Sequence, residues 1–367
     1  MYNYLIVGAG LFGSTFAYEM AKKGKKCLII DSRKHIGGNC YTEQKDDINI
    51  HTYGPHIFHT NNEKIWDWIN QFTKFNNYKH SPKVFYKNKF YSFPINLFTL
   101  HQLWGVNNPT EAEQILNSKK TKIENPSNLE EWILSQVGEE IYYTFIYGYT
   151  KKQWNKEPKN LPAFIIKRLP IRLNFDDNYF YDKFQGIPIG GYTQIFNKLL
   201  QGIEVRTNVD YFENKDYFDG IAEKVVFSGK IDEYFNYEFG ELEYRSLHFE
   251  NLLIEKNDFQ GNSIVNYTEY HIPYTRITEH KHFESSNSKV TWITKEYPKN
   301  YGKKDVPYYP INDERNSKIY DLYKQKSLNH KNIIFGGRLG NYKYYDMHQI
   351  IGQALKAAED EKSLRKT

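Results

Sequence analysis

The first thirty residues consist of two short apolar runs with a helical stretch between them. Residues 4–7 (YLIV) and 26–30 (KCLII) have the length and composition of strands. Residues 11–23 between them have a helical pattern, which Gly24 ends. This order predicts a strand–helix–strand unit with a parallel sheet at the start of the chain.

The apolar pattern changes period between residues 84 and 160. Residues 84–93 (VFYKNKFYSF) form two short runs around a polar turn, which predicts a β-hairpin. Helical patterns follow after Asn108, at 127–133 and at 139–149. Asn108 has the position of an N-cap, and Ser127 and Glu130 have the spacing of a capping box. We expect an inserted helical domain at 95–160.

The pattern turns to strands and loops after residue 161. Residues 204–207 and 224–229 read as strands after a helix at 192–200, and 240–310 is rich in short β runs, most clearly 263–267 and 290–294. A last strand at 332–335 meets Gly336 and Gly337 before a helix at 346–358. This segment predicts a return of the chain to the N-terminal sheet.

Glycines in the first turn indicate a dinucleotide. Gly8, Gly10 and Gly13 form a G-x-G-x-x-G between strand and helix, and Asp31 ends the next strand. Such glycines allow a tight turn, approach of the backbone to a pyrophosphate and close helix–strand packing, while the carboxylate accepts from a ribose hydroxyl. The helix N-terminus offers free N–H groups to phosphate. The alternative is a glycine turn in an unrelated α/β unit.

A second pair of glycines narrows the choice of cofactor. Gly37 and Gly38 come shortly after the acidic strand end and are followed by Asn39. Backbone without side chains at this point favours FAD over NAD.

Composition and charge exclude few classes. The chain has 367 residues, 40% hydrophobic and 25% charged, which is ordinary for a globular protein of two or three domains. The net charge of +5 is mild, and no basic run with interleaved aromatic residues indicates nucleic acid. The 32 tyrosines suggest a carbohydrate surface, but compositional drift explains most of them.

The two cysteines, Cys27 and Cys40, do not have the spacing of metal ligands. Two thiols in a long chain favour a reducing compartment. We see no signal-peptide pattern and no apolar run of membrane-spanning length. We therefore expect a cytoplasmic protein without a metal and without a membrane span.

Several segments together resemble bacterial UDP-galactopyranose mutases. They are HIGGN, GPHIFHT, GYTKKQW, LPAFIIKRLP, DDNYF, GIPIGGY, EYRSL, PYTRITEHKHF, TKEYP and FGGRLGNYKYYDMHQ, and they follow the order of the family along the whole chain. The resemblance implies a Rossmann-like FAD-binding domain with an inserted helical bundle and an antiparallel β-sheet domain. The limits we expect are 1–80, 186–240 and 315–367 for the FAD domain, 95–160 for the bundle, and 81–94, 161–185 and 241–314 for the sheet.

The resemblance also implies an activity. Such enzymes interconvert UDP-galactopyranose and UDP-galactofuranose, the precursor of galactofuranose in cell-surface polysaccharide, and are homodimers. The reaction needs reduced FAD although no net redox change occurs, so an external reductant is a partner. Flavin N5 forms a covalent adduct with the anomeric carbon of the sugar, and UDP leaves and returns.

Two arginines match the family residues that hold the diphosphate. They are Arg168 in IIKR and Arg276 in PYTR. Arginine suits this role because it stays charged and has a fixed fork of donors. Without the resemblance, each would be read as a surface or salt-bridged arginine.

Further positions match the substrate and cofactor sites of the family. On the substrate side, Tyr179, Tyr308, Tyr309 and Tyr344 match diphosphate contacts, Phe145, Tyr149 and Trp154 match the uridine side, and Asn266 and Asp346 match nucleotide surroundings. A helix core stripe is the alternative for Phe145 and Tyr149, and an N-cap for Asp346. On the cofactor side, the matches are Gly8, Gly10, Phe12, Gly13, Asp31, Gly38, Asn39, His56, Arg338 and Met347.

Three histidines stand at or near positions that the family uses around its flavin and substrate. His56 matches a loop beside the isoalloxazine, where a proton donor or dipole would stabilise reduced flavin, and we count it with the two arginines as catalytic. His59 is a candidate for substrate selection. His80 stands where the family commonly has Asn, so the contact made there is altered.

Other functions remain to be weighed. UDP-N-acetylgalactosamine is an alternative substrate, because few side chains decide the 2-substituent pocket. An amine oxidase-like oxidoreductase shares the nucleotide unit but has no need of two arginines with a set of tyrosines. A non-catalytic UDP-sugar or nucleic-acid binding protein has only the net charge in its favour. Closure of residues 167–182 over substrate is a family expectation.

Overall fold

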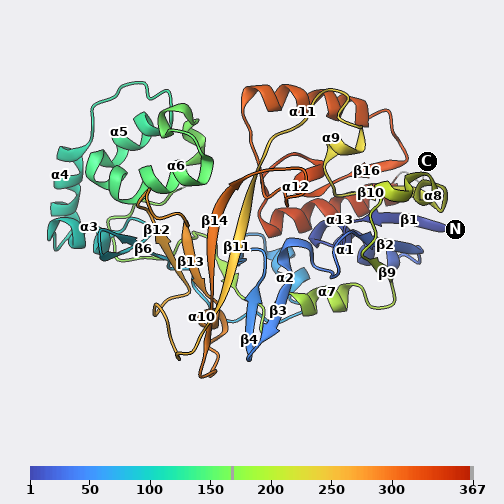
Figure 1. Ribbon diagram of the computed structural model, residues 1–367, viewed down its shortest axis with the longest axis horizontal. Helices are drawn as coiled ribbons and strands as arrows, with labels where there is room; N and C mark the ends of the chain where they lie inside the picture. The colour runs from blue at the N-terminus through green and yellow to red at the C-terminus, as the bar shows by residue number, and fades with distance from the viewer. Residues whose placement is uncertain (167–168, 364–367) are drawn as a thin grey trace.

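A parallel sheet of five strands carries the glycine-rich turn. The computed structural model describes residues 1–166 and 169–363. The strand order is β16-β10-β1-β2-β9, all neighbours parallel. The strands are β1 (Tyr2–Val7), β2 (Cys27–Asp31), β9 (Glu204–Thr207), β10 (Ala222–Phe227) and β16 (Ile333–Phe335). The sheet thus draws on three separate stretches of the chain, as Figure 1 shows by its blue, green-yellow and red strands.

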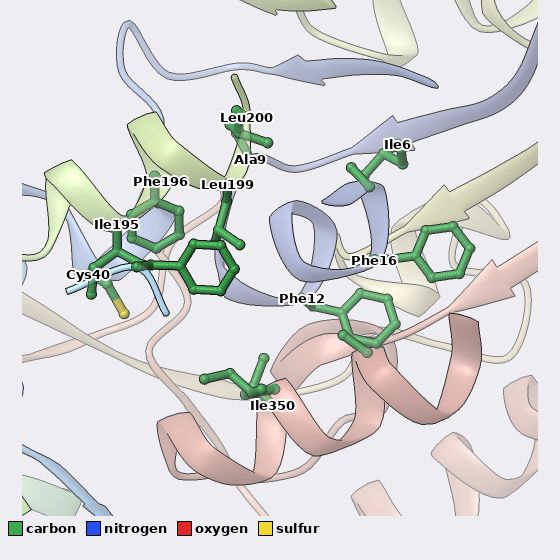
Figure 2. Packing of buried hydrophobic residues seen from close by; sticks show 14 of the residues in the cluster. Ile6, Ala9, Phe12, Phe16, Cys40, Ile195, Phe196, Leu199, Leu200 and Ile350 are labelled. Atoms are coloured by element: carbon green, nitrogen blue, oxygen red, sulfur yellow. The ribbon is translucent and has the colours of Figure 1, made fainter. Parts of the chain in front are cut away.

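Helices α1 (Leu11–Ala21) and α13 (Met347–Ser363) pack together on this sheet. Phe12, Phe16 and Ile350 belong to their shared apolar core, and Figure 2 shows Phe12 pointing toward α13. Burial of such large side chains contributes about 1.5–3 kcal/mol each. The first turn of α1, which opens the dinucleotide motif, therefore rests on an anchored helix.

The second sheet has seven strands in the order β15-β11-β14-β13-β12-β6-β7. Its neighbours are antiparallel except β6 and β12, which run parallel. The strands are β6 (Lys83–Tyr86), β7 (Lys89–Ser92), β11 (Tyr244–Ile254), β12 (Ile264–Tyr267), β13 (Arg276–Glu279), β14 (Thr291–Asn300) and β15 (Tyr309–Pro310). The predicted hairpin at 84–93 is β6 and β7, with Lys87 and Asn88 at positive φ in its turn.

The inserted helices lie at the end of the second sheet (Figure 1). They are α3 (Leu97–Trp104), α4 (Pro109–Lys119), α5 (Leu129–Ile141), a π-helical segment (Tyr142–Tyr147) and α6 (Gly148–Trp154). The helix predicted at 139–149 begins where expected, after the kink of α5 at Gly138, but it includes the π-helical turn and continues to Trp154. Gly138 has φ +76°, and a Cβ there would lie 2.1 Å from the carbonyl oxygen of Lys119.

The caps of two bundle helices test the sequence signals. The side chain of Asn108 accepts from the amide of Glu111, as predicted. The capping box predicted from Ser127 is wrong by one residue. Asn128 is the N-cap, since its Oδ1 accepts from the amide of Glu131, while Ser127 donates to the Glu131 carboxylate.

The remaining elements connect the sheets. They are β3 (Thr42–Lys45), β4 (Ile48–His51), β5 (Phe58–Thr60), α2 (Glu63–Ile69), β8 (Phe184–Gly186), α7 (Thr193–Leu199), α8 (Lys215–Gly220), α9 (Ile231–Tyr234), α10 (Lys281–Glu284), α11 (Glu314–Ser327) and α12 (Gly337–Gly340). The fold is α/β, as predicted, while the domain limits given above stay a prediction. Within the described residues, no helix combines the length and apolar character that a membrane crossing requires.

Candidate active site

Arg276 begins β13 at the centre of the second sheet. It is paired in register with Asn266 on β12 and with Glu296 on β14. Two residues that the sequence placed near the substrate, Arg276 and Asn266, are therefore direct neighbours across two strands. Glu296 is added to them by the structure alone.

The guanidinium of Arg276 has two close partners. It donates to the phenol oxygen of Tyr149 on α6, and its Nε lies 3.4 Å from a carboxylate oxygen of Glu296. Burial opposes the positive charge, but the Glu296 carboxylate together with the oxygens of Tyr149 and Tyr309 outweighs burial, so the pKa of Arg276 is raised. The side chain of Glu296 is only 3% exposed, whereas that of Arg276 is 23% exposed. A fixed cation is thus held by a buried anion and still reaches the surface of the site.

Two tyrosines extend the site toward the first sheet. The rings of Tyr309 and Tyr344 stack with centroids 5.8 Å apart, and the Arg338 guanidinium lies 4.8 Å above the Tyr344 ring. Burial raises the pKa of Tyr309, with Glu296 adding to the effect, so its phenol remains a proton donor. These residues connect the Arg276 end of the site with Arg338, which the sequence predicts at the cofactor.

Tyr308 has other surroundings than the adjacent Tyr309. It is 5% exposed, its ring packs edge-on against Phe249, and Arg33 and Tyr53 are among the groups that influence its charge. Tyr308 therefore faces the cofactor side. The structure does not place its side chain next to Arg276, where the predicted diphosphate contact would be.

Of the residues predicted for the uridine side, Phe145 and Trp154 belong to the core of the bundle, whereas Tyr149 lies at Arg276. Phe145 is 3% exposed and stacks on Phe93 at 6.2 Å, and Trp154 packs at the edge of the same cluster. Tyr179 is 5.4 Å from the ring of His80 and 6.2 Å from that of Phe93. Phe145 thus has the core role given as its alternative, and its contact with a base stays a prediction.

His80, the departure from the family, is buried within this region. Its Nδ1 lies 3.2 Å from the phenol oxygen of Tyr78, and its carbonyl accepts from the amide of Tyr179. Burial lowers the pKa of His80 to about 3, helped by the Arg276 charge. A neutral imidazole therefore stands beside Arg276.

His56 is held as a neutral ring. Its Nδ1 lies 2.8 Å from the carbonyl oxygen of Gly54, which requires the proton on Nδ1 and leaves a lone pair on Nε2. Burial lowers the pKa of His56 to about 4. The structure thus favours a hydrogen-bond acceptor at Nε2 over the proton donor suggested from the sequence.

The glycine turns form a cradle free of side chains. Gly8 has φ +111°, and a Cβ on Gly13 would lie 2.1 Å from the Gly8 carbonyl oxygen. Gly10 and Gly38 face each other, since a Cβ on Gly38 would lie 3.0 Å from Gly10 Cα. The two glycine motifs found in the sequence thus meet at the N-terminus of α1.

Asp31 and a cation line the far end of this cradle. The Asp31 carboxylate accepts from the amides of Ala9 and Arg33, at 2.8 Å each. Arg33 Nη2 donates to Asn39 Oδ1 at 2.8 Å, and its guanidinium lies 4.3 Å above the Tyr53 ring. Arg33 Nη1 is buried without a hydrogen-bond partner among the described residues. A half-buried cation with a free donor beside Asn39 fits the diphosphate of a dinucleotide.

Three further predicted residues take part in packing or in a helix start of the protein itself. The ring of Phe12 lies under Gly336, where a Cβ would be 1.9 Å from it, and Met347 is buried in the core of the first sheet. Asp346 precedes α13, and its carbonyl accepts from the amides of Gln349 and Ile350. For Phe12, only the backbone at the helix N-terminus is left for the cofactor.

Three residues at or near the candidate site were not predicted from the sequence, and one predicted residue lies outside the described part of the chain. Arg168 is not among the described residues. Glu296 was missed because nothing local marks it, and Arg33 was missed although it follows Asp31 by two residues. Lys152 was missed because the GYTKKQW motif does not tell which of its lysines is buried.

Two groups of described residues could geometrically hold a metal ion. His59, Asp346 and His348 form one, and Asp258, Glu279 and His282 the other. His59 already pairs with Asp182, and His282 is 3.1 Å from Asp258. Both groups are accounted for as polar networks of the protein.

Two family models match the chain. The model of the UDP-galactopyranose mutases matches residues 144–344, which hold Arg276, Tyr149 and Tyr309, and a model of NAD(P)-binding Rossmann-like domains matches residues 6–72. Relatives are similar over almost the whole chain: a dTDP-fucopyranose mutase of Escherichia coli is 43% identical, with 98% of each chain covered. The chain belongs to the UDP-galactopyranose mutase family. It is therefore an isomerase of the mutase type.

Other members of this mutase family are also similar. A protein named "Probable UDP-galactopyranose mutase" from Klebsiella pneumoniae is 41% identical, covering 98% of this chain and 94% of the relative. A UDP-galactopyranose mutase of Mycoplasma genitalium is 32% identical over the same shares. A crystal structure of reduced UDP-galactopyranose mutase matches the fold with a TM-score of 0.73 at 14% identity, covering 99% of this chain and 94% of the other.

Proposed function

We propose that this protein interconverts UDP-galactopyranose and UDP-galactofuranose with the help of reduced FAD. The observation that carries the proposal is the cluster of Arg276, Tyr149, Tyr309 and Tyr344, in a member of the UDP-galactopyranose mutase family. A fixed cation among phenols suits a diphosphate that must leave the sugar and return to it.

The cofactor is inferred from the cradle. Facing glycines, the N-terminus of α1 and the free donor of Arg33 suit the diphosphate of a dinucleotide, and Arg338 with His56 suits a flavin ring. Reduced flavin supplies the nucleophile, N5, for the anomeric carbon of the sugar. The physiological reductant is external to the chain.

The protein residues have separate roles in this proposal. Arg276, together with Arg168, balances the charge of UDP when it departs, and Tyr149, Tyr309 and Tyr344 donate to its phosphate oxygens without adding charge. Glu296 holds the Arg276 guanidinium in place. Neutral His56 offers its Nε2 lone pair to the flavin side. Asn266, Phe145 and Trp154 bound the nucleotide.

A second substrate is favoured by a specific observation. The relative from Escherichia coli that is 43% identical is named for dTDP-fucopyranose. The two nucleotide sugars differ in the base methyl, the ribose 2′-hydroxyl and the hydroxyl at C6 of the sugar. His80 lies within reach of the Arg276 charge and Tyr179 packs against His80, so such a preference would act through these two residues.

The experiment uses the purified flavoprotein with and without dithionite. UDP-galactofuranose and dTDP-fucofuranose are offered separately, and the pyranose products are separated by chromatography. The proposal expects conversion of the UDP-sugar only after reduction. Faster conversion of the dTDP-sugar would assign the second substrate, and oxygen consumption with an amine would assign an oxidase instead.

The cellular setting stays a prediction from the resemblance. It comprises a cytoplasmic homodimer that supplies galactofuranose for surface polysaccharide.

A further inference from the structure

Lys152 on α6 is a buried lysine with all of its donors in use. Its side chain is 8% exposed. Its Nζ donates to the carbonyl oxygens of Tyr267, Ile272 and Tyr274 at 2.7, 2.9 and 2.9 Å. An ammonium group has three hydrogens, so each of them has one acceptor.

The three carbonyls belong to one segment, residues 267–274, which connects β12 with β13. Two further contacts press this connector onto the bundle. Thr268 Oγ1 donates to the Thr144 carbonyl oxygen at 2.6 Å. A Cβ on Gly148 would lie 2.2 Å from the Thr268 carbonyl oxygen, so only glycine allows this approach.

We call the three hydrogen bonds from Lys152 to the connector the clamp. Predicted substrate residues flank it on the connector and on α6. Asn266 directly precedes the connector, and Arg276 follows Tyr274 by two residues. On α6, Tyr149 lies three residues before Lys152 and accepts from Arg276. The spacing between α6 and β13 therefore decides whether the phenol of Tyr149 reaches the guanidinium.

We propose that Lys152 is a positioning residue, whose ammonium group holds the connector 267–274 against α6 and so sets the Arg276–Tyr149 pair for the nucleotide diphosphate. This inference rests on the proposed function for the identity of the ligand. Lys152 itself touches neither substrate nor cofactor.

The neighbouring lysine provides a contrast. Lys151 pairs with Glu157 at 2.5 Å and touches the connector only through the exposed ring of Tyr270, which its ammonium group overlies at 4.5 Å. Its partners among the described residues are side chains, and the connector carbonyls that Lys152 holds are not among them. Loss of Lys151 thus removes a charge from the same turn of helix without removing the clamp.

The clamp is also sensitive to pH. Burial lowers the pKa of Lys152 to about 7, and the carboxylate of Glu269 on the connector opposes this shift. The phenols of Tyr267 and Tyr274, whose pKa values are raised by burial, stay neutral beside it. A neutral amine has two hydrogens for three carbonyls, so one carbonyl loses its partner as the pH rises through about 7.

The test measures binding of UDP-galactose to the oxidised FAD holoenzyme by calorimetry at pH 6.0 and 8.5. The diphosphate of this sugar nucleotide does not titrate in that range. We compare wild type, Lys152→Met, Lys152→Arg and Lys151→Met, with the Tm and FAD content of each. With reduced protein, KM and kcat are measured for the same set.

The proposal expects Lys152→Met to raise the Kd at pH 6.0 about tenfold or more, because hydrogen bonds to a charged group are lost. It expects Lys151→Met to stay within about twofold. KM follows Kd while kcat changes little. Wild type binds more weakly at pH 8.5, and Lys152→Arg removes that pH dependence because arginine stays charged.

Equal Kd values for Lys152→Met and Lys151→Met would overturn the proposal. If Lys152→Met does not fold, an unchanged Kd between the two pH values in wild type would overturn it as well. Absence of UDP-galactose binding to wild type would instead contradict the proposed function, so the two failures are distinguishable.

Discussion

The Nε of Arg276 lies 3.4 Å from a carboxylate oxygen of Glu296 on the next strand. The two residues are paired in register on β13 and β14, so the sheet itself fixes their distance. Glu296 is nearly inaccessible, whereas Arg276 reaches the site. The charge that we propose for the contact with the substrate diphosphate is therefore balanced from behind before any nucleotide binds.

Glu296→Gln keeps the shape of this pair and removes its charge. Loss of one partner of a buried ion pair destabilises strongly, up to about 3–5 kcal/mol. We expect a lower Tm and weaker binding of UDP-galactose, measured by thermal unfolding and calorimetry.

The control for this change is Glu250→Gln on β11. Glu250 lies 3.6 Å from Lys295 at the surface, and its loss leaves Tm and affinity as in wild type. Equal behaviour of the two variants would contradict the role of Glu296.

Gly38→Ala tests the cradle. Gly38 has φ +54°, and its Cβ would lie 3.0 Å from Gly10 Cα, where the two glycine turns meet. Strain in a left-handed position costs about 1–3 kcal/mol. We expect the purified variant to carry less FAD, measured by the ratio of flavin to protein absorbance.

Gly105→Ala is the matched change at an open position, because Gly105 has φ +70° and no heavy atom lies within 4 Å of a Cβ there. It retains the wild-type flavin content. Full flavin content in Gly38→Ala would show that the cofactor does not use this cradle.

Four buried histidines predict how stability depends on pH. Burial lowers the pKa of His56 to about 4 and those of His80 and His280 to about 3, and it places that of His51 well below 6.5. The unfolded chain binds more protons than the folded chain below about pH 6.5. The free energy of unfolding is therefore highest above that pH and falls as the pH drops toward 4. Each histidine contributes up to about 1.4 kcal/mol per pH unit to this fall.

Chemical unfolding at pH 7.5, 6.0 and 5.0 measures this slope. His80→Asn, which removes one of the four groups, makes the slope shallower by the share of one histidine. A free energy of unfolding that stays constant down to pH 5.0 contradicts the buried neutral state.

The part of the fold that follows from local spacing could be predicted from the sequence. Gly8, Gly10, Gly13 and Asp31 define a strand–turn–helix unit within one short segment, and the structure has it at the expected place. The hairpin turn at Lys87 is local in the same way.

What depends on register or on neighbouring side chains could not be predicted. Glu296 meets Arg276 only because two strands pair with one particular offset. Tyr308 and Tyr309 match the same family contact, yet successive residues of an extended chain point to opposite faces. Ser127 and Asn128 are both residue types that cap helices. Asn128 is the N-cap of α5 because its backbone is the last extended one before the helix.

The rate at which Arg276→Ala interconverts the two sugar nucleotides is the decisive measurement of the role of this arginine. The variant is loaded with FAD, reduced with dithionite and assayed for conversion of UDP-galactofuranose. We predict a kcat/KM lower by about 10²–10³ at wild-type flavin content, because loss of a group that stabilises a developing charge has an effect of this size. A kcat/KM equal to that of wild type would contradict it.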